Sequence, residues 1–390
     1  MKNKRIWFQI AAWVVCFALA YRLFSFVQAD QVRKEERYAE LQLKAAELEE
    51  TDDQQLDVQT EVYDKLCSQL ETPVFICWGD SAMAGNREDS LPSALNRVID
   101  QNLFSPLSRT FSRVLENKDH ELPSVTVNNM GVGNEGMRQI LVRAGVNTMD
   151  LGESIEIYAE AEPVTVKLMD EEAWNSEEKD DELKFAKQRD ISFGKVRISG
   201  IEGSLITTDD WFDSSHPRYA FIRDEDGNRQ WIGSRTEVEI ETATQFLGQI
   251  PVFFFENDSG RSTEGLASDI ERLVQRYADT ETEDDPDADG SSGGFGSGQE
   301  DDSEEEPTDQ SSYELPFVVI CTTKEGSDLD KDLVRRFGDR YIRNDKYSND
   351  MTGSSYRVLA QEVYDNLNEQ GCFVTVQGKI ALAVEEADSY

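Results

Sequence analysis

Ser81 follows the apolar segment Val74–Trp78 and closes the short sequence Gly79-Asp80-Ser81. Such a segment is typical of a buried strand, and a residue just beyond the carboxyl end of a parallel strand faces the crevice where open α/β sheets bind ligands. A serine hydroxyl in that crevice can attack an acyl carbonyl if a base takes its proton. Three residues alone do not specify a reaction, and the competing interpretation is a plain Asp-Ser turn.

Three segments together resemble the blocks of the SGNH (GDSL-like) hydrolase family. Gly79–Gly85 is similar to the first block, whose serine is the nucleophile. Asn129–Gly145 is similar to the second block of members in which a glycine-rich turn and a Glu precede a helix ending in Arg-x-Gly. Glu256–Asp258 looks like the third block, whose asparagine side chain is an oxyanion donor. The resemblance covers about residues 73 to 372, apart from an acidic linker.

The resemblance implies a role for each matching residue. Ser81 would be the nucleophile, and Asn257 together with the backbone N–H groups of Ser81 and Asn134 would hold the oxyanion. Asn134 stands where the family has a glycine. Its Cβ restricts the backbone, although Asn tolerates a positive φ better than most residues do.

The last block departs from the family pattern. The family places Asp-x-x-His before its terminal helix, whereas here the spacing puts Tyr347 at the Asp position and Asp350 at the His position. A carboxylate is a much weaker base than imidazole. The chain has two histidines. His120 is expected to be an exposed loop residue away from the site, and His216 is an available base in the inserted segment.

Two functions therefore stay open. The first is a serine esterase or O-acyltransferase, weakened by the loss of Asp-x-x-His, that acts on acyl esters of envelope glycans or similar surface substrates. The second is a catalytically inactive SGNH module that binds or scaffolds other molecules in the envelope. A purely structural envelope protein is a third interpretation. It differs from the first two in that Ser81 would be unreactive.

Alternating strands and helices must position these residues. A buried apolar run followed by an amphipathic segment recurs along the chain, which predicts a parallel sheet covered on both faces. The resemblance implies a three-layer αβα, flavodoxin-like domain. The predicted strands are 74–78, 124–129, 250–255 and 317–321, and the predicted helices are 91–102, 137–144, 265–278, 329–337 and 356–370.

A different pattern occupies the middle of the chain. Segments near residues 154–161, 164–168, 195–199, 218–223 and 236–241 alternate apolar and polar residues, as half-exposed antiparallel strands do. Asp224–Asn228 is predicted to be a hairpin turn. Trp211, Phe212 and Trp231 are predicted to lie in the core or rim of this β domain, with an aromatic carbohydrate platform as the alternative.

The N-terminus predicts a membrane anchor. Lys2, Lys4 and Arg5 precede an apolar run from residue 6 to 27, long enough at ~1.5 Å per residue to cross the ~30 Å hydrocarbon core. The basic flank favours a cytoplasmic N-terminus, so the bulk of the protein is expected outside the cytoplasm as a single-pass membrane protein. A cleavable signal peptide is the rival interpretation.

These patterns divide the chain into eight expected regions. They are the cytoplasmic tip and transmembrane helix (1–29), a helical stalk (30–72), the first segment of the SGNH-like domain (73–150), the β insertion (151–247), the second SGNH-like segment (248–278), a disordered acidic linker (279–312), the third SGNH-like segment (313–376) and a C-terminal tail (377–390).

Composition restricts the partners. The net charge of −39 repels phosphate backbones, which excludes nucleic acid, and two histidines are too few for a histidine-rich metal site. No cofactor or metal is expected. The expected partners are the membrane, an acyl-ester or glycan substrate and a membrane protein. Cys77 and Cys321 lie in predicted strands and are expected to be buried thiols, with no disulfide framework.

Overall fold

The structure is a computed structural model that forms two compact units. It describes residues 21, 22, 26, 28, 33, 34, 37–44, 54–85, 89–176, 182–185, 193–208, 218–256, 262–278, 313 and 315–389. The first unit comprises Met1–Gln69, Leu107–Glu121 and Leu382–Tyr390, and the second comprises Leu70–Pro106 and Leu122–Ala381.

The first unit contains a helix over residues 54–69, where the apolar spacing predicts one. Tyr63 is buried on it, with its ring 5.3 Å from that of Phe111 and its hydroxyl donating to the carbonyl of Glu121 at 2.7 Å. His120 lies edge-on to Tyr63, and its Nε2 is 3.2 Å from a carboxylate oxygen of Asp64. The expectation of an exposed His120 is therefore wrong, because 16% of its side chain is exposed.

The predicted membrane segment falls almost entirely outside the described residues. Residues 21, 22 and 26 are helical. Within the described portion of the chain, no helix has the length and apolar character needed to cross a membrane. The acidic segment 279–312 also lies outside the described residues.

A five-stranded parallel sheet is the centre of the second unit. Its order is β14-β13-β12-β1-β2, with every neighbouring pair parallel. The strands are β1 (Val74–Gly79), β2 (Thr126–Asn129), β12 (Ile250–Glu256), β13 (Val318–Thr322) and β14 (Tyr341–Asn344). The sequence predicted the three inner strands and the edge strand β2, but not the other edge strand, β14.

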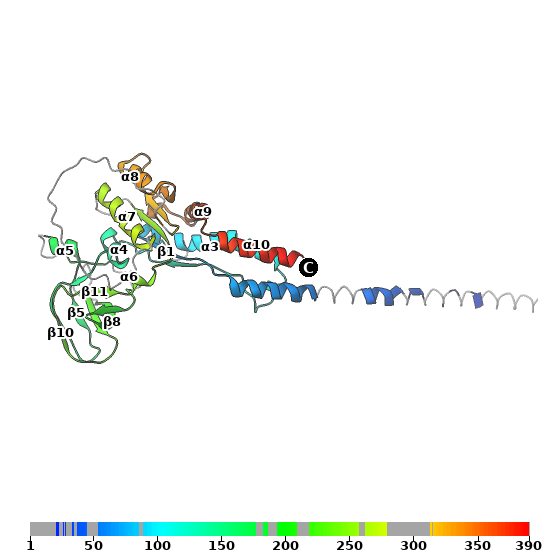
Figure 1. The fold of residues 1–390 in the computed structure, drawn as a ribbon, viewed down its shortest axis with the longest axis horizontal. Coiled ribbons are helices and arrows are strands. Elements are labelled where there is room, and N and C mark those ends of the chain that lie inside the picture. Colours follow the sequence, from blue (N-terminus) through cyan, green and yellow to red (C-terminus); the bar gives the residue numbers. More distant parts are fainter. Residues whose placement is uncertain are drawn as a thin grey trace, which may run out of the picture. The chain divides into compact units, whose positions relative to one another are not determined.

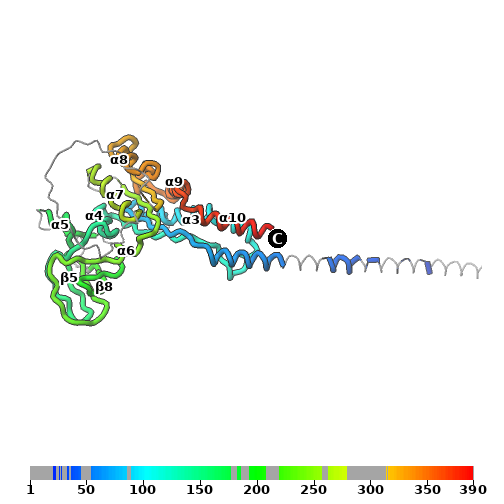
Figure 2. The backbone as a smooth tube through the Cα atoms, in the orientation of Figure 1, coloured from blue at the N-terminus to red at the C-terminus, as the bar shows by residue number. Residues whose placement is uncertain are grey.

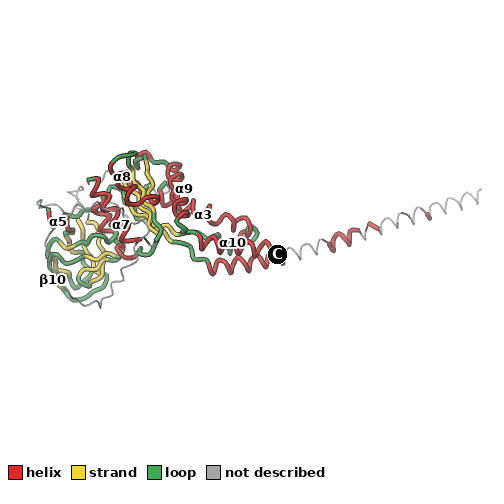
Figure 3. Tube along the Cα trace, turned by 45° about the horizontal axis from the view of Figure 1, so that its top comes forward, coloured by secondary structure: helices red, strands yellow, loops and turns green. Residues whose placement is uncertain are grey.

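Helices flank both faces of this sheet, as predicted (Figures 1 and 3). One face packs against α4 (Met137–Arg143), α7 (Thr263–Ala278) and α8 (Asp328–Phe337). On the other side lie α3 (Leu91–Thr110) and α9 (Gly353–Glu369). The sheet is buried on both faces, and Cys77 and Cys321 are buried free thiols, as expected.

The C-terminus differs from the prediction of a tail over 377–390. After α9 the chain forms α10 (Val374–Asp388). Val376, Ile380, Ala383 and Ala387 recur at helical spacing and are buried, whereas Val374 and Leu382 are exposed. The spacing of these small and branched residues is a helix signal that the sequence interpretation missed.

The inserted segment forms a separate antiparallel sheet, which confirms the β character predicted for it. The order is β11-β7-β8-β9-β5, and two further strand pairs are β10–β4 and β3–β6. The strands are β3 (Asp150–Leu151), β4 (Ile155–Ile157), β5 (Val164–Val166), β6 (Leu168–Met169), β7 (Val196–Ile198), β8 (Ile201–Thr208), β9 (Arg218–Arg223), β10 (Gln230–Ile232) and β11 (Val238–Ile240). Two short helices are α5 (Glu171–Asn175) and α6 (Thr242–Gln245).

Two details of the insertion correct the sequence interpretation. Asp224–Asn228 does not join paired strands, because β9 and β10 belong to different sheets. The tight hairpin lies instead between β7 and β8, where Ser199 and Gly200 both have positive φ. The colours of Figure 2 show that the chain leaves the parallel sheet for the insertion and then returns to the same sheet.

Candidate functional site

The site is at the carboxyl edge of the parallel sheet. The chain runs from β1 to β2 on one side of β1 and then returns through β12 on the other side. In doubly wound sheets, this reversal opens a crevice beyond the carboxyl ends of the two central strands, and ligands bind there. Ser81 follows β1, and Glu256 is the last residue of β12. Trp211, Phe212, His216 and Asn257 lie outside the described residues.

Ser81 and Asn134 meet in this region. Ser81 is half-buried and begins the short helix α2 (Ser81–Ala84). The backbone N–H of Asn134 donates to Ser81 Oγ at 3.0 Å. Asn134 has φ +63°, the left-handed conformation that glycine adopts without cost, and its side chain is exposed. Asparagine at this position therefore keeps both the backbone conformation and the N–H.

The backbone of the loop after β2 fixes the position of Asn134. The N–H groups of Met130 and Val132 donate to the carbonyls of Cys77 and Gly79, at 2.8 and 3.2 Å. A Cβ on Gly131 would lie 2.5 Å from the backbone nitrogen of Ala84, so this close approach requires glycine. The loop thus continues the pairing of β2 with β1 beyond the strand ends.

A buried ion pair also holds the loop after β2. Arg143, at the end of α4, donates from Nε to Glu135 Oε2 at 2.8 Å and from a terminal nitrogen to the carbonyl of Met130 at 2.8 Å. Both side chains of the pair are at most 2% exposed. The guanidinium carbon lies 5.3 Å from the centroid of the Trp78 ring. Because Glu135 follows Asn134 directly, the ion pair anchors the residue whose N–H contacts Ser81.

Asp80 links the two central strands, a role that sequence reasoning did not assign. One carboxylate oxygen accepts from the N–H of Ala82 at 2.9 Å and the other from the N–H of Glu256 at 2.7 Å. Burial raises the pKa of Asp80 to about 6, and these two N–H groups only partly oppose that rise. The sequence does contain a signal for this role, because Asp80 lies between Gly79 and Ser81 and so directly follows the end of the predicted strand.

Glu256 holds the segment that carries Tyr347 and Asp350. Its carboxylate accepts from the N–H of Ser348, which begins a 3-10 turn over Ser348–Asp350. Tyr347 is 47% exposed, and Asp350 is also exposed. Among the described residues, neither side chain forms a hydrogen bond or ion pair with Ser81. The hydrogen bond to Glu256 holds this segment against the end of β12, but it brings no described basic group into contact with the Ser81 hydroxyl.

The described residues supply no proton acceptor to Ser81. In that portion of the chain, Ser81 Oγ makes a single hydrogen bond, in which it accepts from Asn134. His120 belongs to the other compact unit, where it pairs with Asp64. The described residues also contain no group of three or more metal-ligating side chains. The described residues therefore present a serine hydroxyl and an N–H donor at this site, and no triad is found among them.

No family model matches this chain, and neither a curated protein nor a solved structure does so.

Proposed function

We propose that the chain is a membrane-anchored, extracytoplasmic SGNH-like serine esterase or O-acyltransferase with weakened catalysis. The observation that carries this proposal is the 3.0 Å contact from the Asn134 N–H to Ser81 Oγ at the carboxyl edge of the sheet. The strand order, the helices on both faces and the β insertion support a three-layer, flavodoxin-like SGNH domain interrupted by that insertion.

In the proposed reaction, Ser81 Oγ attacks the carbonyl carbon of an acyl ester. The developing oxyanion takes hydrogen bonds from the Asn134 N–H and from the Asn257 side chain. The serine proton passes to water, because the described residues place no base on the hydroxyl. Collapse of the tetrahedral intermediate then breaks the ester C–O bond, and the leaving alkoxide takes a proton from water and departs as the alcohol. Water, or an acceptor hydroxyl in acyl transfer, finally takes the acyl group from Ser81. A serine without its base loses several orders of magnitude in rate, so turnover is slow.

The second candidate is a binding module that keeps the crevice and has lost catalysis. The binding module is favoured because Tyr347 and Asp350 are exposed and do not contact Ser81. Such a module would hold an acylated envelope glycan without cleaving it. The two candidates differ in whether Ser81 reacts covalently.

The apolar N-terminal run and the basic residues before it support the proposed membrane location and orientation. Acyl esters of envelope glycans are the proposed substrates because they are accessible on that side of the membrane. The negative charge of the protein supports neutral or cationic esters over polyanionic ones.

A fluorophosphonate probe tests the proposal on the full-length protein. We expect slow labelling of the wild type, none of Ser81→Ala, and unchanged labelling of Ser204→Ala, an exposed serine on β8. Hydrolysis of an aryl acetate should be weak, and Tyr347→Asp combined with Asp350→His should raise it. Absence of labelling in both the wild type and the combined variant would contradict the esterase and favour the binding module. Fast turnover that survives Ser81→Ala would contradict both.

A further inference from the structure

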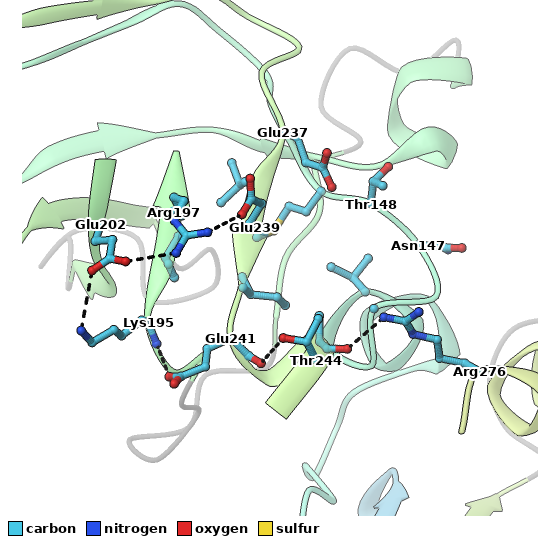
Figure 4. A pocket seen from close by; sticks show the side chains of 17 residues that line it. Asn147, Thr148, Lys195, Arg197, Glu202, Glu237, Glu239, Glu241, Thr244 and Arg276 are labelled. Atoms are coloured by element: carbon cyan, nitrogen blue, oxygen red, sulfur yellow. Dashed lines mark hydrogen bonds and ion pairs between the residues drawn. The ribbon is translucent and has the colours of Figure 1, made fainter. Parts of the chain in front are cut away.

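A cavity of about 490 Å³ lies between the parallel sheet domain and the β insertion. Its walls are residues 145–149 after α4, strands β7 and β11, helix α6 and the end of α7 (Figure 4). Small-molecule sites occupy about 300–1,000 Å³ and often lie between domains. The cavity is separate in sequence from the strand ends that carry Ser81, and the proposed ester chemistry does not use it.

Most charges on the cavity wall neutralise one another. The guanidinium of Arg197 lies 3.1 Å from Glu202 and 3.3 Å from Glu239. The ammonium of Lys195 is 3.7 Å from Glu202, and its backbone N–H donates to Glu241 at 2.7 Å. Figure 4 shows these residues joined in one row by dashed lines across β8, β7 and β11. The row holds the two cations Lys195 and Arg197 and three carboxylates, so it leaves no cation free for a ligand.

Two charged side chains of the wall, Arg276 and Glu237, lie outside this row. Arg276, on α7, makes one long hydrogen bond, from a terminal nitrogen to the carbonyl of Ala243 at 3.4 Å, and its Nε is buried without a partner among the described residues. Glu237, just before β11, is exposed, and within the described chain its carboxylate forms no hydrogen bond or ion pair. Thr148 also lines the cavity. A guanidinium whose terminal nitrogens make only one long hydrogen bond gains from a ligand that accepts hydrogen bonds.

We propose that this cavity binds a small zwitterion that carries an ammonium and a carboxylate, that is, an amino acid or a short peptide. Arg276 receives the carboxylate, because a guanidinium matches the two oxygens of that group. Glu237 receives the ammonium, with Thr148 as a further acceptor. A ligand without net charge avoids the repulsion that a protein of net charge −39 exerts on simple anions.

Calorimetric titration of the full-length protein in detergent tests the proposal with four probes. We expect L-alanine or di-L-alanine to bind with a Kd in the millimolar range or below. N-acetyl-L-alanine lacks the ammonium and L-alaninamide lacks the carboxylate, so each should bind at least about tenfold more weakly. Preference for alanine over dialanine, or the reverse, identifies a free amino acid or a peptide as the source.

Substitutions assign the two ends of the site. Arg276→Gln should abolish the preference for L-alanine over L-alaninamide. Glu237→Gln should abolish the preference for L-alanine over N-acetyl-L-alanine. Arg335→Gln, on the exposed side of α8, should leave binding unchanged. If the Arg276→Gln variant does not fold, the affinities of the four probes for the wild type still test the proposal. Equal binding of all four probes, or no heat from either alanine or dialanine, would overturn the proposal. Neither result depends on the reactivity of Ser81.

Discussion

Replacing Arg143 with Met tests how far the buried ion pair supports the Asn134 loop. The substitution keeps an unbranched apolar side chain against Trp78 but leaves the carboxylate of Glu135 fully buried without its cation. It also removes the donor to the Met130 carbonyl. Breaking a buried pair in this way costs about 3–5 kcal/mol of unfolding free energy. At about 2 °C per kcal/mol for a large domain, Tm should fall by about 6–10 °C.

Urea denaturation followed by tryptophan fluorescence measures this loss. Adding Glu135→Gln to Arg143→Met should recover a fraction of it, because no charge is then left buried. Burial already raises the pKa of Glu135 in the wild type. Without Arg143 the carboxyl takes a proton more readily, so the deficit of the single variant should shrink as the pH falls. Arg335→Met is the exposed control. A loss below about 1 kcal/mol, or a double variant less stable than the single one, would refute the reasoning.

Two further outcomes follow from the residues around Ser81. The pKa of Asp80 is raised to about 6 in the folded state, so between about pH 4 and 6 the folded protein binds a proton at Asp80 more tightly than the unfolded chain does. The contribution of Asp80 to the free energy of unfolding therefore falls as the pH rises through this range. The stability of Asp80→Asn relative to wild type should therefore improve by up to about 3 kcal/mol between pH 4 and 7, and urea midpoints that show a constant difference would contradict this. Asn134→Ala should cost about 1 kcal/mol because alanine is strained at φ +63°, whereas Asn134→Gly should stay within about that amount of wild type. An alanine variant as stable as the glycine variant would show that the backbone relaxes there.

The inner strands of the parallel sheet were predictable because continuous apolar runs followed by turn residues have few other interpretations. β14 was not, since Tyr341–Asn344 is short, contains Arg343 and lies at the sheet edge. Local alternation likewise predicted several strands of the insertion but not their partners. The pairing of β8 with β9, and of β10 with β4, depends on contacts between distant segments that no local pattern encodes.

For the candidate site, the sequence predicted which residues follow the strands but not their hydrogen bonds. The resemblance of the two segments to family blocks implied a role for Asn134 beside Ser81, and the hydrogen bond between them is seen only in the structure. The bridging roles of Asp80 and Glu256 depend on which backbone N–H each carboxylate reaches, and sequence spacing does not specify this. The buried pair of Glu135 and Arg143 has a visible signal, a Glu and an Arg eight positions apart around an apolar helix.

The donor that reaches Ser81 is a main-chain group, and this affects how the protein can change in evolution. Almost any substitution at position 134 leaves an N–H there, and only proline deletes it. The hydrogen bonds that place this N–H also run from backbone to backbone, from Met130 to Cys77 and from Val132 to Gly79. A contact made through a side chain, by contrast, is lost with a single substitution. The hydrogen bond to Ser81 therefore tolerates sequence change at position 134 far better than a side-chain contact would.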